Sequence, residues 1–203
     1  IALAANQERF TAPHAGRRLR TDLGFIPAFW ASEGDMVLVD DVEAAIEARR
    51  HLRKFGKDVV FVTYADLKAF AFEDVESFRV DPWGWDRTIK EQLLRANSNL
   101  QPFMPSDDTL AAIREMSSRR FAAEYLLPLL REAGEEKTVG EARYCTTMEE
   151  VKLTMAQNGK SVLKSPWSSS GRGVRYVETA SLDAHLEGWA ANVVKRQGCI
   201  MVE

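Results

Sequence analysis

One segment near the end of the chain constrains its fold more than any other. Two short β-type runs, residues 161–164 and 174–177, flank a loop that holds three consecutive serines, two glycines and an arginine. Two strands joined by so small a loop predict a β-hairpin. The first run ends in Lys164, so this segment offers backbone N–H groups, hydroxyls, an ammonium and a guanidinium. Such groups hold polyphosphates, and glycine lets the backbone approach the phosphates closely.

The hairpin loop does not match the phosphate-binding loop that precedes a helix in many nucleotide-hydrolysing enzymes. That loop needs a glycine ahead of its Gly-Lys-Ser/Thr at a fixed spacing. Thr154 stands at this place ahead of residues 159–161, and a strand rather than a helix follows. A plain turn at the tip of a hairpin is therefore an alternative interpretation, because serine and glycine are common turn residues.

Length and composition exclude several classes of protein. The chain has 203 residues, enough for one large domain or two small ones, and 45% of them are hydrophobic. Its formal net charge of -3 argues against general nucleic-acid binding. No apolar run approaches the roughly 18 residues of a membrane-spanning helix. We therefore expect a soluble globular protein without nucleic-acid or membrane partners.

The cysteines and the chain ends carry two further expectations. Cys145 and Cys199 both lie in β-type runs. We expect them to be buried thiols rather than a disulfide, and the protein to be cytoplasmic. The chain begins at Ile1 without a methionine and stops at Glu203 inside a β-type run, which suggests a piece of a longer protein.

The first half of the chain predicts a small open α/β domain of the Rossmann type. A β-type run, a stretch of helical periodicity and a second β-type run follow one another with short links, as in a βαβ unit with parallel strands. Thr88 and Glu91 fit a capping box for a further helix. The expected elements are a helix over 14–32 divided near Gly24 and Pro27, strands 36–39, 58–62 and 77–80, and helices 42–55 and 88–97.

The second half predicts a four-stranded sheet. A stretch rich in proline and polar residues, 101–108, marks the predicted domain boundary, and strands and helices interleave beyond it. Thr147 and Glu150 fit a capping box. The expected elements are helices 109–116 and 118–127 with a kink or restart at Pro128, strand 142–146, helix 148–157 ended by Gly159, strands 161–165 and 174–177, helix 182–195 and strand 199–203.

This order of elements and motifs resembles the nucleotide-binding front part of an ATP-grasp fold. In that superfamily a strand lysine touches the α-phosphate, and Lys164 in the run 162–166 matches it. A glycine-rich hairpin then closes over the β- and γ-phosphates, and residues 168–173 match that hairpin. A later strand ends at a hinge whose glutamate holds the adenine and ribose, and Glu203 matches this glutamate.

The resemblance implies a fold class and a set of site residues. The fold is α/β, with a small Rossmann-like pre-ATP-grasp domain at 1–105 and the nucleotide-binding, α+β part of an ATP-grasp domain at 106–203. Arg172 would also neutralise charge that develops on the γ-phosphate during transfer. The nucleotide contacts that the resemblance implies are Lys164, Ser168, Ser169, Ser170, Gly171, Arg172, Gly173 and Glu203.

The sequence departs from the ATP-grasp pattern at two places. The family has a lysine at the start of the helix after the domain linker, where this chain has Arg119 and Arg120. Arginine keeps the charge but contacts phosphate with a different geometry, and the resemblance implies that Arg119 or Arg120 contacts the nucleotide phosphates in place of this lysine. The family's magnesium ligands, acidic residues and an asparagine, would lie on later strands beyond Glu203. No metal ligand is therefore assigned within this chain.

The resemblance implies a fragment, inactive alone, of an ATP-dependent carboxylate ligase that binds Mg-ATP. The full-length form would convert an unknown carboxylate to an acyl-phosphate, which an amine or thiol then captures. The alternative is a non-catalytic nucleotide- or anion-binding α/β module that uses the same loop. A generic α/β protein whose hairpin is an ordinary turn is the third interpretation.

Three other groups of residues have a functional and a structural interpretation. Trp83 and Trp85 follow a predicted strand and would form either an aromatic wall for a substrate or a plug between domains. The basic segment 6–20 would face either an anionic substrate or solvent. The three histidines show no metal-ligand spacing with cysteines or carboxylates.

Overall fold

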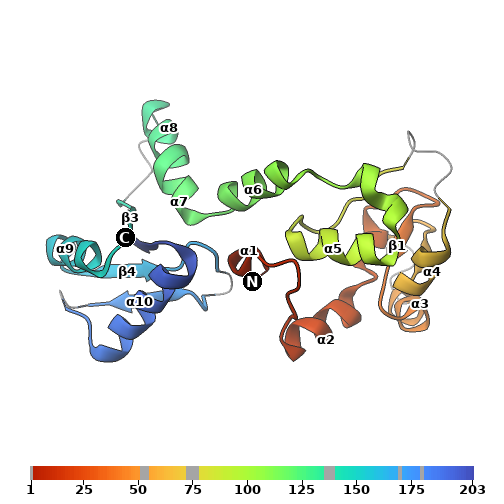
Figure 1. The fold of residues 1–203 in the computed structure, drawn as a ribbon, viewed down its shortest axis with the longest axis horizontal. Coiled ribbons are helices and arrows are strands. Elements are labelled where there is room, and N and C mark those ends of the chain that lie inside the picture. Colours follow the sequence, from red (N-terminus) through yellow and green to blue (C-terminus); the bar gives the residue numbers. More distant parts are fainter. Residues whose placement is uncertain (1, 51–54, 72–77, 135–139, 169–170, 179–180) are drawn as a thin grey trace. The chain divides into compact units, whose positions relative to one another are not determined.

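The computed structural model describes residues 2–50, 55–71, 78–134, 140–168, 171–178 and 181–203. The chain divides into two compact units. One contains residues 7–106, and the other contains residues 107–203 together with residues 3–6. Figure 1 shows both units, with helices and strands labelled where there is room. Helix α1 covers Ala2–Ala5. Each unit has its own sheet, so the α/β fold class is confirmed.

The unit of residues 7–106 contains the predicted βαβ arrangement. Strands β1 (Met36–Leu38) and β2 (Val60–Val62) pair in parallel, with Val37 opposite Phe61. Helix α3 (Val42–Arg50) connects them and buries Ala45 in the same core as Val37. A parallel pair needs such a crossover, and the helix of the crossover covers the sheet. The sheet that the structure describes in this unit has these two strands.

The helices of this unit confirm part of the sequence prediction and correct part of it. Helix α2 (His14–Leu23) ends at Gly24 and a 3₁₀ turn (Ile26–Phe29) follows, so the predicted division of the helix is confirmed. Residues 78–80 form no strand, and Ser77 lies outside the described residues. A short helix that was not predicted, α4 (Tyr64–Ala69), begins at a capping box of Thr63 and Asp66.

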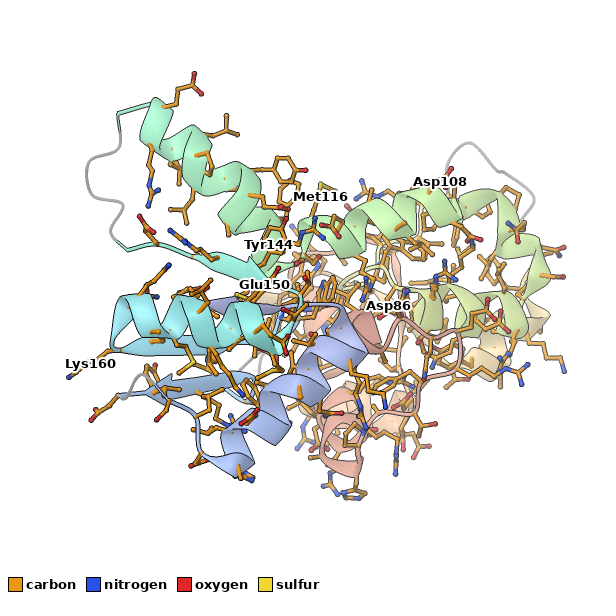
Figure 2. All side chains as sticks on the ribbon, turned by 60° about the vertical axis from the view of Figure 1, so that its left-hand side comes forward. Asp86, Asp108, Met116, Tyr144, Glu150 and Lys160 are labelled. Atoms are coloured by element: carbon orange, nitrogen blue, oxygen red, sulfur yellow. The ribbon has the colours of Figure 1, made fainter. Side chains whose placement is uncertain are left out.

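The predicted capping box of helix α5 (Arg87–Ala96) is wrong. Asp86, labelled in Figure 2, is the N-cap, and its carboxylate accepts from the Ile89 N–H at 2.9 Å. The Thr88 hydroxyl instead donates to the carbonyl of Gln7 at 2.6 Å. Asp86 satisfies an otherwise unpaired N–H of the first turn, which leaves the threonine free for this distant contact. A 3₁₀ helix (Ser98–Phe103) follows α5.

The unit of residues 107–203 begins with helices. Helix α6 (Asp107–Met116) is followed by α7 (Arg119–Phe121), a π-helical turn (Ala122–Leu126) and α8 (Leu127–Glu132). The sequence predicted a kink or restart at Pro128. Proline lacks an N–H and clashes with the carbonyl of the preceding turn, and the wider π-helical turn ahead of Pro128 accommodates it without ending the helical path.

The rest of this unit is the predicted four-stranded sheet. Strands lie in the order β3-β6-β4-β5, and every neighbouring pair is antiparallel. The strands are β3 (Arg143–Cys145), β4 (Ser161–Lys164), β5 (Val174–Val177) and β6 (Ile200–Val202). Two helices accompany them, α9 (Met148–Asn158) and α10 (Ala184–Gln197), and Figure 1 shows both beside β4.

Local signals explain where these two helices begin and end. Thr147 and Glu150 form the predicted capping box of α9, and Gly159 ends it with a φ of 74° that favours glycine. Asp183 caps α10, whose end at Gly198 has a left-handed conformation. The helix core residues Val151, Met155, Ala190 and Val193 are buried against the sheet. Cys145 and Cys199 are buried free thiols, as predicted.

Among the described residues, none of the helices combines the length and apolarity that a bilayer crossing requires.

Candidate functional site

The sheet of the 107–203 unit has two chemically different faces, because side chains alternate along each strand. One face is apolar and packs against α9 and α10 through Cys145, Leu163, Val177, Ile200 and Val202. The side chains of alternate residues lie on the opposite side, which we call the second face. In the observed register it carries Tyr144, Val162, Lys164, Tyr176 and Met201.

Lys164 and Glu203 meet on the second face. The Val162 N–H donates to the Glu203 carbonyl at 2.6 Å, and the Glu203 N–H donates to the Val162 carbonyl at 3.0 Å. Glu203 is therefore opposite Val162, two residues from Lys164 on the same side of β4. The Lys164 ammonium forms an ion pair with the Glu203 carboxylate, and both side chains are about 30% exposed or less. The structure thus brings two predicted site residues together, one from the end of β4 and one just after β6.

A depression of about 250 Å³ lies beside Glu203. Val162 and Tyr176 are cross-strand partners and line it from the second face. Tyr176 is 79% exposed, so its ring presents an aromatic surface to solvent. Figure 2 labels Lys160, which lines the depression just ahead of β4. The other lining residues are Ser161, Val177 and Glu178.

The two ends of the predicted glycine loop, which connects β4 and β5, lie close together. The Ser165 N–H donates to the Gly173 carbonyl at 2.8 Å, which extends the strand pairing by one step. A Cβ at Gly173 would collide with Cβ and Oγ of Ser168 and lie 3.0 Å from Oγ of Ser165. Gly171 has a φ of 71°, which favours glycine. Gly171 thus suits the backbone conformation of this loop, and Gly173 suits its close approach to the Ser168 side chain.

The other predicted loop residues are placed only in part. Ser169 and Ser170 lie outside the described residues. Arg172 is exposed at the far end of the loop, and its carbonyl accepts from the Arg175 guanidinium at 3.1 Å. The exposed position leaves the Arg172 side chain accessible to a bound anion.

Arg119 and Arg120 point to different places, although they are consecutive. Arg119 donates to the carbonyl of Ser165 at 2.6 Å and to the hydroxyl of Ser168 at 2.7 Å, so it contacts the loop directly. Arg120 pairs with Glu124 at 2.8 Å and lies over the ring of Tyr144, 4.6 Å from its centroid. Of the two predicted arginines, the structure therefore brings Arg119 to the loop and Arg120 to strand β3.

The surroundings of Arg120 raise the pKa of two groups. Its hydrogen bond to Glu124 holds the pKa of the Arg120 guanidinium above its ordinary value. Hydrogen bonding to Glu124 also raises the pKa of Tyr144. Figure 2 shows Tyr144 on β3. A surface cluster thus forms from Arg120, Glu124 and Tyr144, whose polar groups bind one another. These contacts explain why Arg120 does not reach the loop.

Sequence reasoning missed the residues that brace the loop from behind and those that line the depression. The Trp167 indole N–H donates to the Arg114 carbonyl at 2.9 Å, and its backbone N–H donates to Gln197 at 3.1 Å. No local signal indicates these long-range contacts. Val162 and Tyr176 were predictable, because period-two alternation places both on the same face as Lys164 once the hairpin is assigned.

The remaining candidates in the sequence do not form a second site in the described residues. Trp83 packs near Trp30 with ring centroids 6.1 Å apart, whereas Trp85 packs into the core around Leu67. The two tryptophans therefore do not form one aromatic wall. Arg20 pairs with Asp40 at 2.5 Å, and this hydrogen bond lowers the pKa of the Asp40 carboxyl. At least this arginine of the basic segment is occupied by the protein's own groups.

Metal-ligating side chains do not gather in the described part of the chain. Across those residues, no three histidine, cysteine, aspartate or glutamate side chains lie where they could share an ion. The donor set around the loop is cationic and hydroxylic, and its carboxylate, Glu203, is engaged by Lys164. These groups fit an anion and do not fit a protein-held magnesium ion.

Comparison with known proteins does not assign the chain to a family. A scan against protein-family models found no matching family. A search of curated proteins found no significant match. The functional argument therefore depends on the residues of the 107–203 unit.

Proposed function

We propose that residues 106–203 bind Mg-ATP on the second face, as the nucleotide-binding part of an ATP-dependent carboxylate ligase of the ATP-grasp type. The observation that carries the proposal is the meeting of Lys164 and Glu203 beside the closed loop between β4 and β5. An ammonium, an exposed guanidinium and a glycine loop surround one end of this surface. An aromatic depression lies at the other end.

Each part of the surface matches one part of the nucleotide. Lys164 would hold the α-phosphate through a charge-assisted hydrogen bond. The loop N–H groups and Arg172 would surround the β- and γ-phosphates. The adenine ring would lie in the depression against Val162 and Tyr176, because every base has a face that can stack on an aromatic ring. Glu203 would accept hydrogen bonds from the adenine amino group or the ribose hydroxyls.

The chemistry that follows from this binding is phosphoryl transfer to a carboxylate. Such transfer depends mainly on positioning and on neutralising the charge of the transferred group. Arg172 would neutralise the charge of the transferred γ-phosphoryl group, while Lys164 holds the α-phosphate. The products would be ADP and an acyl-phosphate open to attack by an amine or thiol. The described residues form no protein-held magnesium site, so we assign no step to the metal beyond its entry with the nucleotide.

The binding role of Lys164 predicts a large loss of affinity in Lys164→Ala. A hydrogen bond to a charged group contributes about 1.5–3 kcal/mol, so Mg-ATP should bind roughly ten- to a hundredfold more weakly. Isothermal titration calorimetry on the whole chain measures the change. Lys152→Ala is the matched control, because Lys152 is an exposed lysine on α9 that pairs with Glu187 and should not affect binding. Equal affinities for wild type and Lys164→Ala would overturn the proposal.

The ion pair itself predicts opposite effects on two ligands in Glu203→Gln. Glu203 occupies Lys164 in the free protein, so removing its charge should strengthen binding of inorganic tripolyphosphate by about two- to fivefold. The same change removes a strong acceptor, so adenosine should bind more weakly. Calorimetric titrations with the two ligands separate the effects. Parallel changes for both ligands would contradict the assigned orientation of the nucleotide.

A further inference from the structure

We infer that Arg119 is the positioning residue of the loop between β4 and β5, and that it does not itself bind the phosphates. The inference rests on the proposed function for the identity of the ligand, but the contacts of Arg119 stand independently of it. A positioning role for Arg119 replaces the phosphate contact that the sequence resemblance implies for this position.

Arg119 makes four hydrogen bonds to residues 165–168, which we call the first limb of the loop. Its guanidinium donates to the Ser165 carbonyl at 2.6 Å, to the Ser168 hydroxyl at 2.7 Å and to the Ser168 carbonyl at 3.2 Å. Its backbone N–H donates to the Pro166 carbonyl at 3.1 Å. A planar guanidinium has five N–H donors in a rigid fork and can hold several acceptors at once. The Arg119 side chain therefore fixes the backbone of the first limb at both of its ends, Ser165 and Ser168.

The first limb in turn fixes residues 171–173, which we call the second limb of the loop. Gly173 approaches Ser168 so closely that a Cβ at position 173 would overlap Cβ and Oγ of Ser168. The Ser165 N–H holds the Gly173 carbonyl at 2.8 Å. The Arg119 side chain thus holds Ser165 and Ser168, the same two residues that Gly173 packs against. A displacement of Arg119 would release both limbs of the loop.

The anchor of Arg119 is itself fixed. Ser118 is buried and caps the short helix α7, accepting from the Arg120 N–H at 3.1 Å. Trp167, between Pro166 and Ser168, is held by its indole N–H on the Arg114 carbonyl. The Arg114 guanidinium lies 3.7 Å from the centroid of the Trp167 ring. Each residue of the first limb, 165–168, is therefore hydrogen-bonded to a residue of α6, α7 or α10.

This arrangement gives Arg119 a defined role in binding. A loop that is already ordered loses less conformational freedom when a ligand binds, so its affinity is higher. The N–H groups that Arg119 uses on the loop are not available to a phosphate. Lysine cannot replace it, because a single ammonium on a flexible stem does not reproduce the fork.

The test compares Arg119→Lys with the matched control Arg120→Lys, which changes the neighbouring residue that faces Glu124 and Tyr144. Hydrogen exchange of peptides covering 165–174 is measured without nucleotide, and affinity is measured for Mg-ATP and for adenosine. We expect Arg119→Lys to speed exchange in these peptides about tenfold and to weaken Mg-ATP about tenfold while adenosine is unchanged. Arg120→Lys should change none of the three.

The other outcomes identify which statement fails. If Arg119→Lys weakens Mg-ATP but leaves exchange of the free loop unchanged, Arg119 is a phosphate ligand and the inference is overturned. If wild type does not bind Mg-ATP, the proposed function fails, and the exchange comparison still decides the role of Arg119. Ser168→Ala, which removes only one acceptor, should give a smaller increase in exchange. Loss of protection in α9 and α10 would instead assign Arg119 to overall stability and overturn the inference.

Discussion

Gly173→Ala should weaken Mg-ATP binding by roughly ten- to a hundredfold and lower the stability of the hairpin. The added Cβ would overlap the side-chain atoms Cβ and Oγ of Ser168. Ser168 is held by Arg119, and Gly173 is held by the Ser165 N–H. Neither limb can move without losing the Ser165–Gly173 bond or the contacts to Arg119. Overpacking of this kind costs about 1–3 kcal/mol. We expect the free loop to relieve it by leaving the conformation that binds the nucleotide, so the same free energy is lost from binding. Calorimetry with Mg-ATP measures it.

Two further variants isolate the cause. In Ser168→Gly with Gly173→Ala, the colliding atoms are gone and the nearest remaining one is Oγ of Ser165 at 3.0 Å. This double variant should bind Mg-ATP within about tenfold of Ser168→Gly alone. Gly188→Ala in α10 is the matched control, because its Cβ meets nothing within 4 Å and it should not weaken binding. Wild-type affinity in Gly173→Ala would show that close packing of the two limbs does not matter.

Leu163→Ala should lower the free energy of unfolding of the 107–203 unit by about 2–5 kcal/mol, the usual cost of a large-to-small change in a core. Leu163 is fully buried on the face that α9 and α10 cover, beside Val177 and Val202. Its removal leaves a cavity between the sheet and the helices. Urea unfolding followed by far-UV circular dichroism measures the change.

The neighbouring residue Val162 supplies the contrast. Val162→Ala changes the second face, where the side chain is only partly buried, and should cost about 1 kcal/mol or less. It should weaken adenosine binding because Val162 lines the depression. Leu163→Ala should leave adenosine affinity unchanged at temperatures where the protein is folded. If Val162→Ala lowered stability more than Leu163→Ala, and Leu163→Ala weakened adenosine binding instead, the assignment of the core face and the second face would be wrong.

Much of the secondary structure could be predicted because its signals are local. Thr147 and Glu150 cap α9 with their own side chains, and Gly159 ends it through its backbone conformation. The hairpin of β4 and β5 follows from two β-type runs and a short loop. The cap of α5 shows the limit of such patterns, because Thr88 is drawn away by the Gln7 carbonyl and Asp86 takes its place.

The site could be predicted only as a list of residues. Lys164 and Glu203 meet because β6 lies beside β4 in the sheet, and strand order depends on the packing of the whole unit. The different directions of Arg119 and Arg120 depend on where the loop and Tyr144 lie in space. Helical spacing alone cannot distinguish the two arginines. The brace of Trp167 on Arg114 is likewise a contact between distant segments.

The most direct test of the central claim is an NMR titration of the isotope-labelled chain with Mg-ATP. The account predicts that amide shifts change at residues 162, 164–168, 171–176 and 203, which lie on the second face and its loop. Amides of the buried helix residues Val151, Met155, Ala190 and Val193 should change little, since they lie behind the sheet. An unchanged spectrum, or changes confined to residues 7–106, would contradict the claim that this surface binds the nucleotide.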